Sequence, residues 1–180
     1  MFDMILKQGS VLYRVIRKEL ASLGRLGRLS AKGRFASYEV PCSYFGRDPP
    51  TCVFETILRD HRLSVIPESW ITGRLMVEVK VSRKLTLANL SDGHALQRLG
   101  LDVPTLLGPG SYALCAEIGR QAYAEGYDGI IYPSRFNGSG TCVALFDRAH
   151  SGLLIRNIWS KSRWEEFAFQ LVDKSGKAVE

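Results

Sequence analysis

The sequence has little of what a metal site, a membrane segment or an export signal requires. Its four cysteines and three histidines are scattered, with no C-x-x-C pair and no spacing typical of metal ligands. No apolar run approaches the roughly 20 residues that cross a bilayer. The first seven residues lack the basic and apolar regions of a secretory signal. We therefore expect reduced thiols in a cytosolic protein with no metal site and no membrane span.

Common catalytic signatures are also missing. Asp60-His61-Arg62 is the wrong order for a kinase catalytic loop, and no glycine-rich loop is followed by a lysine. Residues 108–111 lack the spacing of a phosphate-binding P-loop. No serine lies in a G-x-S-x-G turn. The sequence therefore gives no support for a protein kinase, a P-loop NTPase or an α/β-hydrolase.

The composition is that of one packed domain with an uneven charge. The chain has 180 residues, of which 46% are hydrophobic and 23% charged, and this excludes a wholly disordered chain. The net charge is +6, and residues 1–35 carry all of it, with eight basic and two acidic side chains. The eight are Lys7, Arg14, Arg17, Lys18, Arg25, Arg28, Lys32 and Arg34. Such a segment is typical of binding to a polyanion, a membrane surface or an anionic small ligand. In an arbitrary protein it is most often a solvated face without a partner.

Hydrophobic patterning predicts a mixed fold rich in strands. Branched or alternating apolar residues predict strands over residues 11–16, 42–45, 75–81, 85–90, 130–132 and 141–146, and an edge strand over 152–159. Asp48 and two prolines predict the start of a helix that runs from 51 to about 61. Ser111 is expected to cap a second helix over 112–125, closed by Gly126. We predict a single α+β domain with a flexible tail over 173–180.

Five polar residues stand in positions that suit a site, although each has an ordinary structural explanation. Ser134 directly follows a predicted buried strand, where a turn serine is common. Glu55 lies one turn into a helix, where an acid often only interacts with the helix dipole. Arg14 in an apolar strand can extend outward to water, Arg34 can be solvated, and Tyr44 can be a core aromatic.

Together these five residues resemble the signature of the RES domain family. Tyr13-Arg14 resembles the tyrosine-arginine pair of the family's first strand, and Gly33-Arg34-Phe35 its glycine-arginine-aromatic segment. Tyr44 follows Arg34 by ten residues, and Glu55 follows Tyr44 by eleven. Residues 118–134, which end in Tyr132-Pro133-Ser134, resemble the family's helix, glycine turn, strand and tyrosine-proline-serine block, and residues 141–147 the strand after it.

The chain also departs from the family pattern. Many members follow the arginine-aromatic pair with asparagine-proline, where this chain has Ala36-Ser37, so we expect a differently shaped loop over 36–42. Members often carry an asparagine just before the final strand, where this chain has Gly140-Thr141. Residues 63–73 have no clear counterpart.

The resemblance implies a fold and an activity. Its members are similar to ADP-ribosyltransferase toxins, with a split β-sheet and flanking helices around an NAD cleft, here expected over 1–172. Many are bacterial toxins that cleave the nicotinamide–ribose bond of NAD+, with water or phosphate as acceptor, and one branch is thought to ADP-ribosylate a protein. Arg34, Tyr44, Glu55 and Ser134 are then the expected catalytic residues, and Arg14, Arg34, Tyr44 and Ser134 the expected NAD-binding residues. NAD+ is the substrate and no cofactor is needed.

The residue types suit this chemistry. The arginine fork matches phosphate oxygens, so Arg14 and Arg34 are expected at the pyrophosphate, with Arg34 the stronger candidate. Tyr44 is expected to stack on the nicotinamide or ribose, and Ser134 to hydrogen-bond the nicotinamide amide or position the ribose. Glu55 is expected to stabilise the positive charge that develops on the ribose as the bond breaks.

Partners follow from the same resemblance. An enzyme that drains NAD+ implies a cognate antitoxin or immunity protein over the cleft. It also implies action in the bacterial cytoplasm, of the producing cell or of a target cell reached as a secreted effector. The alternative outside the enzymes is a nucleic-acid-binding module that uses residues 1–35. The surplus basic residues Arg17, Lys18, Arg25, Arg28 and Lys32 have no assigned role under the enzymatic reading.

Overall fold

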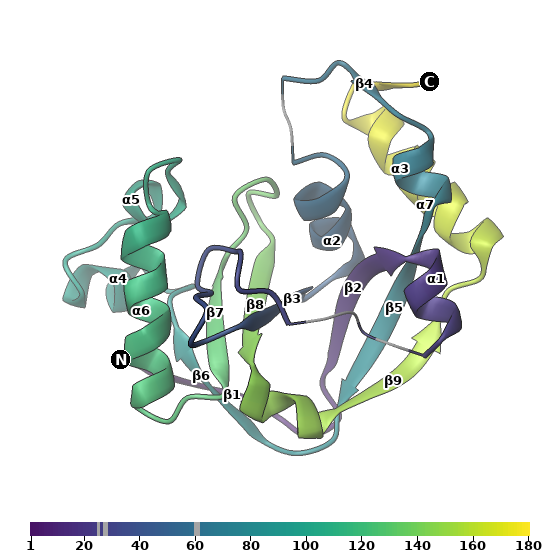
Figure 1. Cartoon of the computed structure of the whole chain (residues 1–180). Helices are drawn as coiled ribbons and strands as arrows, with labels where there is room; N and C mark the ends of the chain where they lie inside the picture. The colour runs from purple at the N-terminus through teal and green to yellow at the C-terminus, as the bar shows by residue number, and fades with distance from the viewer. Residues whose placement is uncertain (25, 27–28, 60–61) are drawn as a thin grey trace.

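An eight-stranded, strongly curled sheet organises the molecule (Figure 1). The computed structural model of the chain describes residues 1–24, 26, 29–59 and 62–180. The sheet order is β1 (Asp3–Leu6), β6 (Leu85–Asn89), β7 (Gly129–Pro133), β8 (Thr141–Phe146), β3 (Cys42–Gly46), β2 (Val11–Arg17), β5 (Arg74–Val81) and β9 (Leu153–Ile158). β6 and β7 pair in parallel, and the other neighbours are antiparallel.

The sheet is split between β2 and β3. These two strands pair at a single position, Tyr13 with Gly46. By contrast, β2 pairs with β5 over its whole length from Val11 to Arg17, and β3 pairs with β8 from Cys42 to Gly46. The two halves of the sheet therefore separate beyond one contact, and a gap opens between them. The predicted single α+β domain with a split sheet is confirmed.

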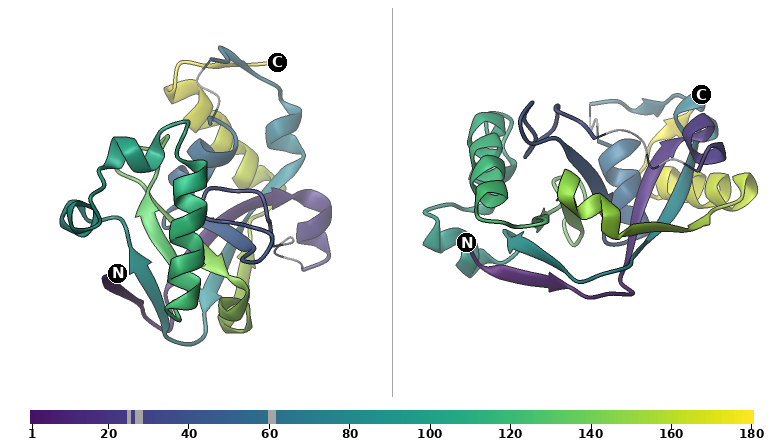
Figure 2. Two further views of the ribbon diagram at one scale, coloured as in Figure 1. Left: turned by 60° about the vertical axis from the view of Figure 1, so that its left-hand side comes forward. Right: turned by 60° about the horizontal axis from the view of Figure 1, so that its bottom comes forward.

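Helices cover the two halves separately (Figure 2). On the β7 side lie α4 (Gly93–Arg98), α5 (Val103–Leu107) and α6 (Tyr112–Ala124). On the β5 side lie α2 (Pro49–Thr56), α3 (Ser69–Thr72) and α7 (Lys161–Lys174). Short α1 (Lys18–Ser22) and the 3-10 turn η1 (Asp147–Gly152) complete the chain, and Ala21 and Ala149 bring them into a third apolar cluster with strand residues. The split thus separates helical layers with different cores.

Most predicted elements are present, with two differences at helix ends. The Asp48 side chain caps α2, and Gly126 after α6 has a positive φ of 89°, which glycine tolerates. The helix expected to reach residue 61 ends at Thr56, because the chain turns to bury Ile57 and Leu58; residues 60–61 lie outside the described part. Ser111 does not cap α6, since its hydroxyl bonds the Gly108 carbonyl instead.

The expectation of a flexible tail over 173–180 is wrong. Helix α7, which the sequence analysis did not predict, continues to Lys174. The chain then forms β10 (Ala178–Val179), which pairs in parallel with β4 (Val65–Ile66). The Glu180 carbonyl also accepts a hydrogen bond from the Glu68 amide at 2.6 Å. The end of the chain is therefore fixed to the segment 63–73, the part without a family counterpart.

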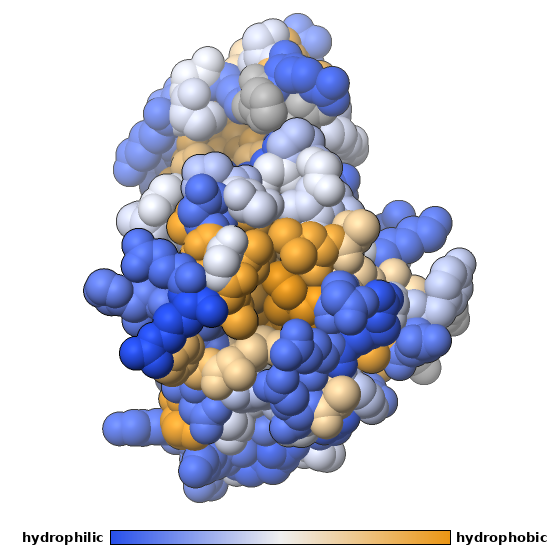
Figure 3. Space-filling view, turned by 90° about the vertical axis from the view of Figure 1, so that its left-hand side faces the viewer, coloured by the Kyte–Doolittle hydropathy of each residue, from blue (hydrophilic) through white to orange (hydrophobic). Residues whose placement is uncertain are grey.

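One face of the molecule carries an apolar patch. Figure 3 shows hydrophobic side chains gathered on the side that bears α4, α5 and α6, ringed by hydrophilic ones. Leu99, Val103 and Leu114 are exposed large apolar residues of this region. In the described part of the chain, no helix combines the length and apolar character needed to cross a membrane.

Candidate active site

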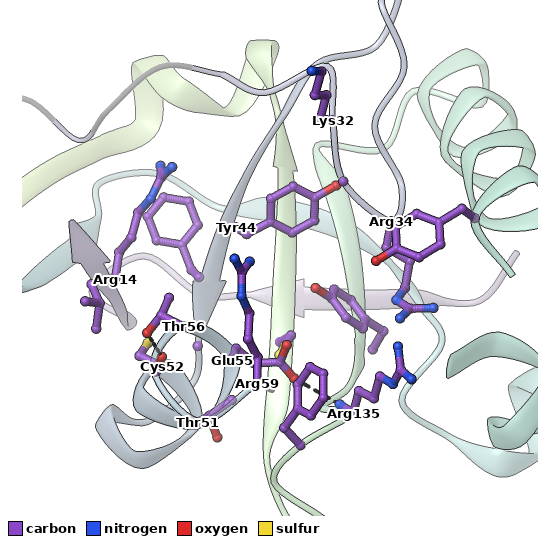
Figure 4. Close-up of a pocket in the computed structure, with 18 of the residues that line it drawn as sticks. Arg14, Lys32, Arg34, Tyr44, Thr51, Cys52, Glu55, Thr56, Arg59 and Arg135 are labelled. Atoms are coloured by element: carbon purple, nitrogen blue, oxygen red, sulfur yellow. Dashed lines mark hydrogen bonds between the residues drawn. The ribbon is translucent and has the colours of Figure 1, made fainter. Parts of the chain in front are cut away.

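A cavity of about 800 Å³ opens where β2 and β3 separate (Figure 4). Its lining comes from both halves of the sheet and from α2 and α6. The basic lining residues are Arg14, Lys32, Arg34, Arg59, Arg62 and Arg135. Glu55 is the one carboxylate that the described residues contribute to the lining. Five aromatic rings complete it: Tyr44, Phe45, Tyr112, Tyr132 and Phe136. As far as the described residues form it, the cavity is therefore a cationic pocket with one negative group, suited to an anionic ligand with flat rings.

Glu55 is held on one side and open on the other. It lies on α2, whose first turn Asp48 caps. Its Oε1 accepts a hydrogen bond from Ser134 Oγ at 2.5 Å and another from the Arg135 backbone amide at 3.0 Å. Both of these bonds go to Oε1, no donor among the described residues is bonded to Oε2, and Figure 4 shows the carboxylate at the cavity wall. One oxygen is thus anchored while the other is available to a ligand.

Ser134 lies behind Glu55 rather than at the cavity surface. It follows β7, is 5% exposed and does not line the cavity. Besides donating to Glu55, its Oγ accepts hydrogen bonds from the amides of Phe136 at 3.2 Å and Asn137 at 3.0 Å. The serine therefore orients the carboxylate and closes the β7–β8 loop. This geometry suits a residue that positions Glu55, whereas the sequence analysis expected Ser134 to contact the substrate.

Tyr44 supports the loop that carries Arg34. Its hydroxyl accepts a hydrogen bond from the Phe35 amide at 3.2 Å. A Cβ at Gly33 would lie 2.4 Å from that hydroxyl, so only glycine fits there. Burial raises the pKa of the Tyr44 phenol, which keeps it protonated at neutral pH. Its ring lines the cavity, as a stacking partner would.

The guanidinium of Arg34 donates hydrogen bonds to other groups of the protein. Its Nη1 donates to the Leu106 carbonyl at 2.7 Å and to Ser111 Oγ at 2.6 Å, and its Nη2 to the Leu107 carbonyl at 3.5 Å. The guanidinium also lies over the Tyr112 ring, 5.2 Å from its centroid. Arg34 therefore ties the chain before β3 to the α5–α6 connection, and fewer of its donors remain for a ligand.

Arg14 occupies the point where the strands part. Its guanidinium carbon is 5.4 Å from the centroid of Phe45, the residue across the split. Burial lowers its pKa from the ordinary value, but the side chain stays charged at neutral pH because an arginine begins so high. Its Nη1 is buried without a hydrogen-bond partner among the described residues. With respect to the described residues, Arg14 therefore has N–H groups free to bond a ligand, whereas most of those of Arg34 are bonded to the protein.

Arg59 and Arg135 are cavity residues that the sequence analysis missed. Arg59 is four residues after Glu55, and Figure 4 shows its guanidinium extending into the cavity toward Tyr44. In the helix that the sequence predicts up to residue 61, this four-residue spacing would place the two side chains on one face. It was therefore an available signal, even though α2 ends at Thr56. Arg135 lies with its guanidinium carbon 5.3 Å from the centroid of the Phe136 ring. Both add positive charge beside the anchored carboxylate.

The N-terminal basic excess is only partly explained by the cavity. Arg14, Lys32 and Arg34 line it. Arg17 and Lys18, at the junction of β2 and α1, are exposed and do not. Arg25 and Arg28 lie outside the described residues.

The cysteines near the cavity are neutral thiols. Cys52 and Cys142 line it but are 4% and 3% exposed. Burial raises the pKa of Cys52 to about 12, and it raises that of Cys142 as well. A thiol is a poor nucleophile until it ionises, so neither cysteine is activated. Within the described ranges, no three His, Cys, Asp or Glu side chains are grouped to hold a metal ion.

Comparisons with known proteins agree with this architecture. The chain is similar in fold to a chain of the crystal structure of the M. tuberculosis MbcT–MbcA toxin–antitoxin complex, with a TM-score of 0.69 and 17% sequence identity over 92% of each chain. None of the curated proteins matches it. The sequence profile of the RES domain matches residues 11–166, which include Arg14, Arg34, Tyr44, Glu55 and Ser134. The chain therefore belongs to the RES domain family.

Proposed function

We propose that this protein is the toxin of a bacterial toxin–antitoxin pair and cleaves the nicotinamide–ribose bond of NAD+. The observation that carries the proposal is the carboxylate of Glu55, anchored through one oxygen at the wall of a cavity to which the described residues contribute six basic side chains and no other carboxylate. NAD+ carries an anionic pyrophosphate, two flat bases and a cationic centre at the nicotinamide, and these features match that lining.

The chemistry requires stabilisation of a positively charged sugar. The bond between the nicotinamide nitrogen and ribose C1′ breaks, and its electron pair leaves with nicotinamide. The ribose then carries oxocarbenium character, which a carboxylate near C1′ or the ribose hydroxyls stabilises. An oxygen of water or phosphate forms the new bond to C1′ and loses its proton to solvent. In this scheme Glu55 supplies the charge, Tyr44 a ring surface, and Arg14, Arg34 and Arg59 hold the pyrophosphate.

The partner in this proposal is an antitoxin or immunity protein that covers the mouth of the cavity. The chain shares its fold with a chain of a complex described as a toxin–antitoxin complex, which supports a partner of this kind. Action on NAD+ places the protein in the bacterial cytoplasm, of the producing cell or of a target cell.

The test is release of free nicotinamide from NAD+ by purified protein, with and without phosphate. We expect release by the wild type and a strong loss in Glu55→Ala. ADP-ribose as the second product indicates water as acceptor, and its 1″-phosphate indicates phosphate. If the wild type and Glu55→Ala release nicotinamide equally slowly, the proposal is wrong. Label transferred from NAD+ to a protein would instead establish ADP-ribosylation.

A further inference from the structure

The two segments that meet at Glu55 are also joined one helical turn away. Asn137, in the β7–β8 loop, donates from Nδ2 to Thr51 Oγ1 at 3.0 Å. Thr51 Oγ1 donates to Asp48 Oδ2 at 2.9 Å, and the other oxygen of Asp48 caps α2 by accepting from the Thr51 amide at 2.8 Å. A continuous chain of hydrogen bonds therefore links the start of α2 to the loop.

The direction of each bond in this chain is fixed. A carboxylate only accepts, so the Thr51 hydroxyl proton must go to Asp48, and its lone pair accepts from the Asn137 amide. Thr51 is fully buried, so water cannot readily replace the amide if it is lost. Loss of either side chain leaves a buried polar group without its partner.

Gly140 allows the loop to come this close. A Cβ at this position would lie 2.3 Å from Thr51 Oγ1 and 2.7 Å from Asn137 Nδ2. Its amide donates to the Asn137 carbonyl and its carbonyl accepts from the Ser134 amide, both at 2.8 Å. The loop is thus closed on itself between the residue that contacts Thr51 and the residue that contacts Glu55.

Thr51 and Glu55 are four residues apart on α2 and occupy the same helical face. Each receives hydrogen bonds from the β7–β8 loop: Thr51 from Asn137, and Glu55 from Ser134 and Arg135. We propose that the Asp48–Thr51–Asn137 hydrogen-bond chain is a positioning device, which holds the loop against α2 so that both donors meet Glu55 Oε1. The carboxylate then keeps one orientation toward the cavity.

This inference rests on the proposed function for its kinetic test but not for its structural one. In the kinetic test, Thr51→Val removes the hydroxyl with little change of shape, and Thr51→Ser keeps it. We expect Thr51→Val to lower kcat for nicotinamide release about 10–100-fold, less than direct loss of a preorganised group. KM for NAD+ stays within about two-fold, because Thr51, although it lines the cavity, has no exposed surface for a ligand to contact. Thr51→Ser restores most of the rate.

The matched control is Thr105→Val. Thr105 stands three residues after Asp102, which caps α5, as Thr51 stands three residues after Asp48. The Thr105 amide donates a hydrogen bond to Asp102 Oδ1 at 2.7 Å. It is exposed and does not line the cavity, so the substitution tests removal of a capping-turn hydroxyl alone. We expect wild-type kinetics. Equal losses in Thr51→Val and Thr105→Val, or equal losses in Thr51→Val and Thr51→Ser, would overturn the proposal.

The structural test needs no substrate. Hydrogen exchange of the Arg135 and Asn137 amides should accelerate at least about ten-fold in Thr51→Val and in Asn137→Ala, because each opens the loop. If the wild type releases no nicotinamide, the proposed function fails while this measurement still decides the positioning role. Unchanged exchange in Asn137→Ala, which removes only a loop side chain and serves if Thr51→Val does not fold, would overturn it.

Discussion

The two walls of the cavity use their hydrogen bonds in opposite ways. On the α2 wall, Ser134 and the Arg135 amide both bind one oxygen of Glu55 and leave the other toward the ligand space. On the α6 wall, Arg34 directs its donors to Ser111 and to the carbonyls of Leu106 and Leu107, which belong to the protein. On the α2 wall the protein holds Glu55 with one oxygen toward the ligand. On the α6 wall Arg34 instead holds parts of the protein together.

Because of this difference, substitutions on the two walls should affect activity and stability to different extents. Glutamine at position 55 keeps an acceptor for the Ser134 hydroxyl and the Arg135 amide, so this change should cost little folding energy. Ser134 also accepts from two backbone amides of the β7–β8 loop, so its loss affects the loop as well. A side chain that bonds buried carbonyls leaves those carbonyls unpaired when it is removed. Glu55→Gln on the α2 wall should therefore mainly affect the rate, and substitutions of Arg34 should also lower the melting temperature.

The largest effect is expected for Glu55→Gln. The amide keeps the shape and one hydrogen-bond acceptor but removes the negative charge that stabilises the developing oxocarbenium. We expect kcat for nicotinamide release to fall about 10²–10³-fold. The melting temperature should stay within about 2 °C, since no buried backbone group loses a partner. Steady-state kinetics and thermal denaturation of the same preparation provide the check. A large loss of stability in Glu55→Gln would show that Glu55, like Arg34, is needed for folding, and the contrast between the two walls would not hold.

Next comes Ser134→Ala, which removes one of the two donors to Glu55 and leaves the Arg135 amide in place. The carboxylate should then sample more orientations. We expect kcat to fall about 10–100-fold while KM for NAD+ changes little. An increase of KM without a change of kcat would show that the serine contacts the substrate, contrary to its position behind Glu55.

Arg34→Lys tests the other wall. Lysine keeps the charge but not the fork that reaches Ser111 and two carbonyls together. We expect about 2 kcal/mol of destabilisation, which corresponds to a melting temperature roughly 4–8 °C lower for a domain of this size. Activity should fall as well, through displacement of the α5–α6 connection. A variant as stable as the wild type would show that Arg34 is not structural.

A smaller effect is expected for Arg59→Gln, which removes an exposed cavity charge that bonds no backbone group among the described residues. KM for NAD+ should rise about 3–10-fold at low ionic strength, and the difference should shrink with added salt. Arg156→Gln, an exposed arginine on β9 away from the cavity, is the matched control and should behave as wild type. Equal changes in the two variants would mean that only net charge matters.

The smallest effect is expected from thiol reagents. Cys52 and Cys142 line the cavity, but burial raises the pKa of both thiols, to about 12 for Cys52. At pH 8 they therefore remain protonated and inaccessible, and treatment with iodoacetamide should leave activity unchanged. Mass spectrometry of the treated protein reports any alkylation. Rapid inactivation with modification of Cys52 would contradict this reading of the α2 wall.

The sequence was informative about elements and about the set of site residues, but not about their contacts. Apolar patterning placed the strands of the large sheet other than β1, because each strand has one or two buried faces. The four-residue β1 was not predicted. Ser134 and Glu55 are 79 residues apart, and Arg34 and the Leu106 carbonyl are 72 apart. No local pattern records such pairings, so the contact of Ser134 with Glu55 and that of Arg34 with the Leu106 carbonyl emerge only from the fold.

Other features were visible and not recognised. Buried Trp164, Ala168 and Val172 recur every four residues after Ser160, which caps α7, so this helix had both a start signal and an apolar face. The pairing of β10 with β4 had no such signal, since each strand has only two residues and their association depends on tertiary packing.

The central claim is that Ser134 acts through Glu55, and a double-mutant cycle tests it most directly. Nicotinamide release is measured for the wild type, Ser134→Ala, Glu55→Gln and the double variant. We predict that Ser134→Ala, which slows the wild type about 10–100-fold, changes kcat by less than about two-fold once Glu55 is glutamine. Full additivity of the two losses would contradict the claim and show that the serine serves the reaction independently.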